Sequence, residues 1–524
     1  MNDAASPIVA AAHQPPIAAG PASGPVPARR ALVLAGGGMR VAWQAGAVKA
    51  LHEAGLRFTH ADGASGGTMN LAALLSGVTP NELCERWRRL PVRAFAALRP
   101  ARDYFPASRL TALGSAEGLT RTVYPGLGID VTRVRGAAGI DASFTVCRFD
   151  DKTAVPLPHT ELDVERLVAA VSLPVFLPAV QAAGATWTDA VWIKDANLLS
   201  CVERGADELW LLWCIGNTHR YHDGAFRQYV HMIEMSALGA LHAELAAIAD
   251  INARIAAGAV VHGHARPIVV RLVKPETPLP LDPDFFRGRI DAATLIDMGY
   301  RDARAALRHG QPAPLTPAAT AMREPGGPGV AFRETMAGRF SLGATDPVAG
   351  AAAPGATTLA LHAAIDIEEI DAFTADPAHR SGLVGHVDFA PFGMALPGQS
   401  GVFALFAPSG EAALTYMVYE LAFRHDGRDY YLAGKKHVRR GPPWRLWRET
   451  TTLYTTLHEG DSAAGPVVGA GILRLGVGEL LCLVRSAHAR NAPTARAGLG
   501  AIWRFVRFFA ASLARTYLRR GRHE

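Results

Sequence analysis

The sequence predicts an α/β domain with a mostly parallel sheet, followed by a β-rich second domain and a C-terminal helix. Up to about residue 308, short apolar runs that end in glycine-rich turns alternate with helical segments, which is typical of parallel sheets. From about Val330, segments of alternating polarity follow one another with turns between them, as in a barrel or a sandwich. The last residues repeat apolar side chains at helical spacing.

The candidate site lies in the stretch from Ala31 to Gly67, which reads as two consecutive strand–turn–helix units. Each turn of this kind connects the carboxyl end of a parallel strand to the helix that follows, and ligand-binding and catalytic sites of parallel sheets lie at these strand ends. The glycines of the first turn are Gly36, Gly37 and Gly38. The second turn reads Gly63-Ala64-Ser65-Gly66-Gly67.

The second turn fits the pattern G-x-S-x-G, with Ser65 at its centre. A nucleophilic serine needs a strained turn with small neighbours, and the helix that follows directs its N–H groups toward developing negative charge. Either pattern alone is weak in a chain with 52 glycines. A phosphate-binding loop is disfavoured, because no G-K-[ST] follows the first turn and Val41 stands where the last glycine of G-x-G-x-x-G would fall.

With both turns at this spacing, residues of about 31–308 resemble the patatin-like phospholipase family. The family's oxyanion loop G-G-G-x-R corresponds to Gly36-Gly37-Gly38-Met39-Arg40, and its second catalytic residue corresponds to Asp189. The resemblance implies a three-layer sandwich and a Ser65–Asp189 dyad that needs no histidine. Arg40 is expected to brace the loop. Asp195 is a rival carboxylate, and two positions depart from the family pattern, namely Ala190 and Val41.

The elements expected downstream agree with this first domain. Three strands and three helices are predicted from apolar runs and helical periodicity. The strands are 143–149, 208–215 and 267–273, and the helices are 161–171, 224–258 and 292–307. Histidines and glutamates in the second of these helices lack the H-E-x-x-H pattern, so a helix surface is favoured over a metal site. No cofactor and no metal are expected.

Composition limits the class of protein. The chain has 524 residues, 49% of them hydrophobic and 19% charged, which indicates a globular protein of several domains. A net charge of +6 is compatible with anionic membrane surfaces and too small to indicate nucleic-acid binding. Five cysteines without a C-x-x-C pair favour free thiols and a cytoplasmic location, with possible contact to membranes. Residues 1–30 read as a disordered Ala/Pro-rich tail without a signal peptide, and no transmembrane helix is expected.

The second half begins after a predicted linker at 309–329, which is rich in Pro, Ala and Gly. Residues 330–497 are predicted to form the β-rich domain, with a hairpin at Asp426-Gly427 and a strand from Thr450 to Leu457. Pieces such as Gly385-His386-Val387-Asp388-Phe389 resemble an accessory region of bacterial proteins related to cholesterol oxidase and other GMC-type oxidoreductases. Without a dinucleotide fingerprint, this implies only an association with lipid- or sterol-related enzymes.

Residues 498–524 form the predicted basic C-terminal helix, and two interpretations of it are open. An apolar face and an arginine-rich face suit the plane of a membrane, with contact through Trp503 to Arg522. Alternatively, the helix docks on the β-rich domain and exposes its basic face. The residues of the apolar face are Ile502, Phe505, Val506, Phe509, Leu513 and Tyr517.

These observations predict a serine lipid acyl hydrolase, similar to phospholipase A or another carboxylic ester hydrolase, whose substrate is a lipid ester. Two alternatives stay open at this point. One is a non-catalytic lipid-binding protein on a patatin scaffold, an alternative supported by the departures from the family pattern at Ala190 and Val41. The other is an acyltransferase or thioesterase with the same dyad, since water exclusion and pocket shape decide the acceptor.

Overall fold

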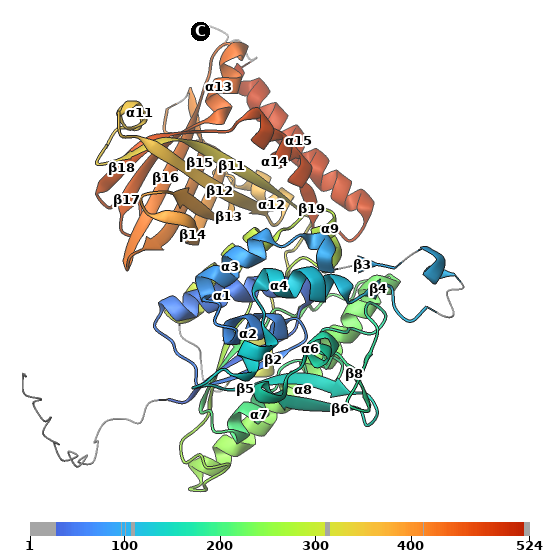
Figure 1. Cartoon of the computed structure of the whole chain (residues 1–524). Helices are drawn as coiled ribbons and strands as arrows, with labels where there is room; N and C mark the ends of the chain where they lie inside the picture. Colours follow the sequence, from blue (N-terminus) through green and yellow to red (C-terminus); the bar gives the residue numbers. More distant parts are fainter. Residues whose placement is uncertain are drawn as a thin grey trace, which may run out of the picture.

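The structure is a computed structural model that describes residues 28–95, 97–99, 101–105, 110–309, 315–411 and 413–517. An α/β domain is followed along the chain by a closed β-barrel domain, and the barrel sits above the α/β domain in Figure 1. Nearly all of the predicted N-terminal tail and part of the predicted linker lie outside the described residues.

An eight-stranded sheet forms the centre of the first domain. Five strands run parallel, in the order β10 (Val269–Val273), β9 (Glu208–Leu212), β1 (Arg30–Leu34), β2 (His60–Ala64) and β5 (Asp141–Arg148). The remaining strands are antiparallel at the far edge, and they are β6 (Thr153–Pro158), β8 (Ala185–Thr188) and β7 (Val180–Ala182). The predicted mostly parallel sheet is confirmed.

Helices cover both faces of this sheet because the central strands are apolar on both sides. In β1, Leu32 and Leu34 pack into one buried cluster, whereas Ala31 and Val33 pack into another on the opposite face. The first face carries α1 (Ala42–Glu53), α2 (Gly67–Leu75), α3 (Pro80–Arg89) and α10 (Ala292–His309). The second face carries α7 (Leu198–Glu203) and the long α8 (Ala225–Ala256). The short α6 (Val164–Ala170) lies against β5, β7 and β8.

The closest helix contact joins α1 to α10, and glycine on both helices makes it possible. A Cβ on Gly46 would lie 1.9 Å from the carbonyl oxygen of Ile296, and a Cβ on Gly299 would lie 1.8 Å from that of Trp43. A side chain at either position would therefore push the helices apart. Helix α10 also packs on the barrel, so this contact links the first domain to the second.

The second domain is a closed, eight-stranded antiparallel barrel. Its strands pair in sequence order, and β11 closes the barrel by pairing with both β12 and β18. The strands are β11 (Gly329–Leu342), β12 (Thr357–Ile367), β13 (Arg380–Phe389), β14 (Gly393–Pro408), β15 (Leu414–His425), β16 (Arg428–Arg439), β17 (Thr452–Glu459) and β18 (Val467–Arg474). A ninth strand, β19 (His488–Arg490), pairs with the start of β11.

Two local features of the barrel test the sequence predictions. Asp426 and Gly427 both adopt positive φ angles, 45° and 78°, so the predicted hairpin turn joins β15 to β16. The strand predicted from Thr450 begins instead at Thr452. Thr450 and Thr451 are instead the last residues of helix α13 (Leu446–Thr451), where their hydroxyls donate to carbonyls of the preceding helical turn.

Helix α15 (Ala495–Tyr517) lies along the barrel, as Figure 1 shows. Its apolar residues Ile502, Phe505, Phe509 and Leu513 pack into the barrel cluster, as the docked interpretation expects. Trp503 remains 66% exposed on another side of the helix. Arg519 and Arg522 lie outside the described residues.

Two helices, α8 and α15, are long and apolar enough to cross a membrane by length and composition alone, although the sequence analysis expected none. Both pack one face on the protein, α8 against the sheet and α15 against the barrel. Their apolar character therefore reflects this packing at least in part.

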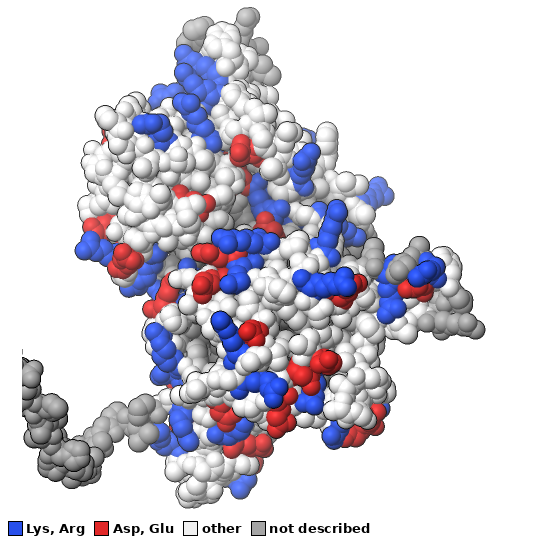
Figure 2. Space-filling view, viewed as in Figure 1, with Lys and Arg blue, Asp and Glu red and all other residues white. Residues whose placement is uncertain are grey.

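Charged side chains bridge the two domains. Figure 2 shows Lys and Arg interspersed with Asp and Glu along the band where the domains meet. Asp297 on α10 lies 2.7 Å from His386 of β13 and 3.5 Å from Arg88 of α3. Arg323 binds Glu368 on the barrel side and Glu276 on the other.

Candidate functional site

Ser65 lies on a left-handed turn between β2 and α2. Its φ is +46°, a left-handed conformation that is uncommon for non-glycine residues. A Cβ on Gly66 would lie 2.7 Å from the carbonyl oxygen of Gly38, and one on Gly67 would lie 2.2 Å from that of Leu34. Both glycines are thus required by the close approach of the first glycine-rich loop and strand β1. Gly63 and Ala64 are the last residues of β2.

The structure brings Asp189 into contact with Ser65. The Ser65 hydroxyl donates to Asp189 Oδ2 at 2.6 Å, across 124 positions of sequence. The second carboxylate oxygen accepts the N–H of Val191 at 2.9 Å, which fixes the orientation of the carboxylate. Asp189 follows β8 directly, and its own N–H donates to the carbonyl oxygen of Ser172. Both side chains of the pair are buried.

Burial controls the acidity of Asp189. Removal from water raises the pKa of this carboxyl to about 7, although the hydrogen bonds from Ser65 and Val191 act in the opposite direction. A carboxylate with a pKa near 7 is basic enough to accept a proton and is still ionised in part at neutral pH.

Asp195 also reaches the site, but it holds the glycine-rich loop. Its Oδ2 accepts the N–H of Gly36 at 2.9 Å, whereas its buried Oδ1 has no hydrogen-bond partner among the described residues. A Cβ on Gly36 would lie 2.3 Å from Asp195 Oδ1 and 2.6 Å from Ser65 Cβ, so the loop fits between the two side chains. Burial first, and the Asp189 charge second, raise the pKa of Asp195 well above its usual range.

Two N–H groups of the glycine-rich loop and the Arg40 side chain are held by neighbouring residues. Met39 donates its N–H to Asp282 Oδ1 at 3.2 Å, and Gly36 is bound by Asp195. Arg40 folds back, so that its Nε donates to the carbonyl oxygen of Gly37 at 3.1 Å. Within the described part of the chain, no acceptor takes the N–H groups of Gly37 and Gly38. These two N–H groups are therefore the donors of the loop that have no acceptor in this part of the structure.

Residues 32–200 match the family model of patatin-like phospholipases. The match spans both glycine-rich turns, Asp189 and Asp195, and it ends before the barrel. It supports a lipid hydrolase at the level of the family.

The other comparisons add little. Among solved structures, the chain is similar to VipD from Legionella pneumophila, with 14% sequence identity and a TM-score of 0.28 over 54% of this chain and 67% of that one. A TM-score this low carries no argument about fold or activity. No curated protein matches the chain. The predicted resemblance of the barrel domain to an accessory region of GMC-related proteins stays a prediction.

The two departures from the pattern of a patatin-like domain have local explanations. Ala190 is fully buried and is not among the described residues with positive φ, so its Cβ imposes no left-handed strain beside Asp189. The Val41 side chain is also buried, 3.6 Å from the position of a Cβ on Gly37 and 2.9 Å from that of one on Gly66. Val41 therefore packs between the two glycine-rich turns.

Two polar residues that support the loop were missed by the sequence analysis. Gln44 of α1 donates to the carbonyl oxygen of Ala35 at 2.6 Å, just before the glycines. Asn70 of α2 donates to the carbonyl oxygen of Val41 at 2.9 Å and to Gln44 at 3.1 Å. Both side chains are fully buried, and each stands between two buried apolar residues in the sequence. This polar interruption of an apolar pattern was the available signal.

Three aromatic side chains form a cluster near Asp189. Tyr229 packs edge-on against Phe176 and Trp192, with ring centroids 5.4 and 5.6 Å apart. Burial, with the Asp189 charge as the second cause, raises the pKa of Tyr229 to about 12. The ring of Tyr229 is thus close enough to Asp189 to be influenced by its charge.

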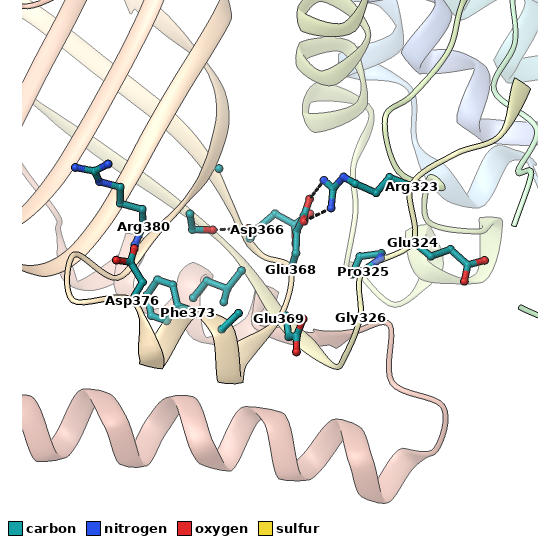
Figure 3. Close-up of a pocket in the computed structure, with 14 residues that line it drawn as sticks. Arg323, Glu324, Pro325, Gly326, Asp366, Glu368, Glu369, Phe373, Asp376 and Arg380 are labelled. Atoms are coloured by element: carbon teal, nitrogen blue, oxygen red, sulfur yellow. Dashed lines mark hydrogen bonds and ion pairs between the residues drawn. The ribbon is translucent and has the colours of Figure 1, made fainter. Parts of the chain in front are cut away.

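A cavity of about 330 Å³ lies elsewhere, between the linker and the barrel. Figure 3 shows Arg323 bound to Glu368 on one side of it, with Asp376 and Arg380 on the other. Neither Ser65 nor Asp189 lines this cavity. Arg323 is already paired with Glu276 and Glu368, so this side chain is not a free cation for an anionic ligand.

Proposed function

We propose that the chain is a serine lipid acyl hydrolase in which Ser65 and Asp189 form a catalytic dyad. The observation that carries the proposal is the 2.6 Å hydrogen bond from Ser65 to Asp189, made by a serine on a left-handed turn between a strand and a helix. The match of residues 32–200 to patatin-like phospholipases supports a lipid ester as the substrate.

In the proposed reaction, Asp189 Oδ2 accepts the hydroxyl proton as Ser65 Oγ attacks the ester carbonyl carbon. The carbonyl electron pair moves to oxygen and forms a tetrahedral oxyanion. Collapse of this intermediate breaks the bond to the leaving alkoxide, which takes the proton back from Asp189. Water then attacks the acyl-enzyme, with Asp189 as the base, and releases a fatty acid and free Ser65.

The N–H groups of Gly37 and Gly38 are the proposed oxyanion donors. Gly36 and Met39, which the sequence analysis included in the loop, instead donate to the carboxylates of Asp195 and Asp282. These two bonds and the Arg40–Gly37 bond hold the loop in one conformation. Preorganised donors of this kind contribute about 3–4 kcal/mol each in other acyl-transfer enzymes.

Asp195 is proposed to be a positioning residue in its uncharged form. Replacement by asparagine keeps an oxygen for the Gly36 N–H, so Asp195→Asn is expected to retain kcat/KM for a p-nitrophenyl ester within about tenfold of wild type. Asp195→Leu leaves the buried Gly36 N–H unpaired, at a cost of about 1–3 kcal/mol, and should lower kcat/KM further. Full inactivation by Asp195→Asn would instead identify Asp195 as a required ionised group.

The pH dependence of hydrolysis tests the role of Asp189. The base must be ionised, and its pKa is about 7, so kcat/KM should fall about tenfold per pH unit below 7 and level off above it. The measurement is the initial rate of p-nitrophenyl ester cleavage between about pH 5 and pH 9, corrected for nonenzymatic hydrolysis. A profile that is flat across the lower half of this range would contradict a base with this pKa.

A further inference from the structure

Two histidines and an aspartate form a cluster on the outside of the barrel. His362 on β12 lies directly opposite His386 on β13, and Asp388 follows two positions along β13. Their neighbours Leu361, Ala363 and Val387 point into the barrel core, so the three polar side chains point outward. One nitrogen from each histidine and one Asp388 oxygen lie within 4.8 Å of one another.

Each side chain of the cluster has a hydrogen-bond partner on the atom that faces away from the other two side chains. His386 Nδ1 donates to Asp297 Oδ2 of α10 at 2.7 Å, and His362 Nδ1 lies 3.2 Å from the hydroxyl of Thr335. Asp388 Oδ1 accepts the N–H of Ala395 at 2.6 Å. Protein metal sites orient their ligands in this way, with carboxylate, hydroxyl or backbone partners on the far atoms.

The donor atoms that a metal would need face one another at the centre of the cluster. His362 Nε2 and Asp388 Oδ2 are 3.1 Å apart, and no described residue hydrogen-bonds to His386 Nε2. The charges around the cluster favour a cation. Two carboxylates, Asp297 and Asp388, are accompanied by one arginine, Arg88, which lies 3.5 Å from Asp297 and leaves an excess of negative charge.

We propose that His362, His386 and Asp388 bind one divalent transition-metal ion, with zinc as the ion to test. Two imidazoles and one carboxylate are a donor set that zinc and its neighbours accept. The two rings are stacked, with centroids 4.5 Å apart and planes at 16°, so one ring must turn for both nitrogens to reach a shared ion. Metal–ligand distances of about 2.1 Å also require the three donor atoms to draw together.

A cation at this place would connect the two domains. Metal binding at His386 Nε2 makes the opposite N–H a stronger donor to Asp297, which belongs to α10 of the patatin-like domain. Zinc should therefore raise the melting temperature of the whole chain, by mass action on the folded state. Hydrolysis at Ser65 is expected to be independent of this ion, because no catalytic group belongs to the cluster.

The experiment is calorimetric zinc titration of the full chain, freed of affinity tag and stripped with EDTA. Wild type should bind one equivalent, whereas His362→Ala and Asp388→Asn should bind at least tenfold more weakly. The matched control is His437→Ala, since His437 is also an outward barrel histidine but stacks on Tyr454 outside the cluster. Visible absorption of bound cobalt should be lost in the same two variants and kept in the control.

Equal zinc affinity in wild type, His362→Ala and Asp388→Asn would overturn the proposal, as would a wild-type chain that binds no zinc. Circular dichroism of each variant excludes unfolding as the cause of lost binding. Ser65-dependent ester hydrolysis, measured on the stripped protein, separates failure of the metal site from failure of the proposed hydrolase.

Discussion

Ser65→Ala is expected to lower hydrolysis of a short p-nitrophenyl acyl ester by a factor on the order of 10⁴ to 10⁶. The substitution removes the attacking oxygen and leaves only substrate binding and the oxyanion donors. Folding should be preserved, because the partner Asp189 has a pKa of about 7 and can take up a proton when the Ser65 hydroxyl is lost. The measurement is kcat/KM of purified wild type and variant, with melting temperatures recorded on the same samples.

Ser76→Ala is a matched control for this substitution. Ser76 is a buried serine at the C-terminal end of α2, the helix that follows Ser65, and its hydroxyl donates to the carbonyl oxygen of Ala72. Its replacement should leave kcat/KM within about twofold of wild type, since the loss of a hydroxyl at a helix end acts on stability rather than on a distant site. Activity retained in Ser65→Ala would show that another residue is the nucleophile.

Asp189→Asn is expected to lower kcat/KM by about 10⁴-fold, as loss of the carboxylate does in other serine hydrolases. Asparagine keeps the shape of the side chain and an oxygen for the Val191 N–H, but it cannot take the Ser65 proton. Because p-nitrophenolate leaves without a proton, the loss should be larger for an alkyl ester, whose alkoxide needs the proton that Asp189 carries.

Comparison with Asp195→Asn decides between the two carboxylates. Both are buried and lie near the Ser65 turn, but Asp189 accepts a hydrogen bond from the Ser65 hydroxyl, whereas Asp195 accepts one from the Gly36 N–H. Severe loss in Asp189→Asn with mild loss in Asp195→Asn fits this division. The reverse pattern would reassign the base to Asp195.

Much of the fold could be predicted from local patterns. The strand predicted at 208–215 appears as β9 (Glu208–Leu212), and the helix predicted at 292–307 appears as α10 (Ala292–His309). Both follow from hydrophobic periodicity, which reports burial of neighbouring residues. The hairpin at Asp426-Gly427 was equally local, since two adjacent residues determine the turn.

The sequence by itself determined the alternation of strands and helices, the two glycine-rich turns and the place of Ser65 at the centre of the second turn. Only the tertiary structure decided that β11 closes a barrel, that the apolar face of α15 packs on it, and that Asp189 rather than Asp195 contacts Ser65. It alone placed Asp297 beside His386, 89 positions away. Local patterns depend on neighbours along the chain, whereas these contacts depend on how distant segments pack, which no short-range pattern encodes.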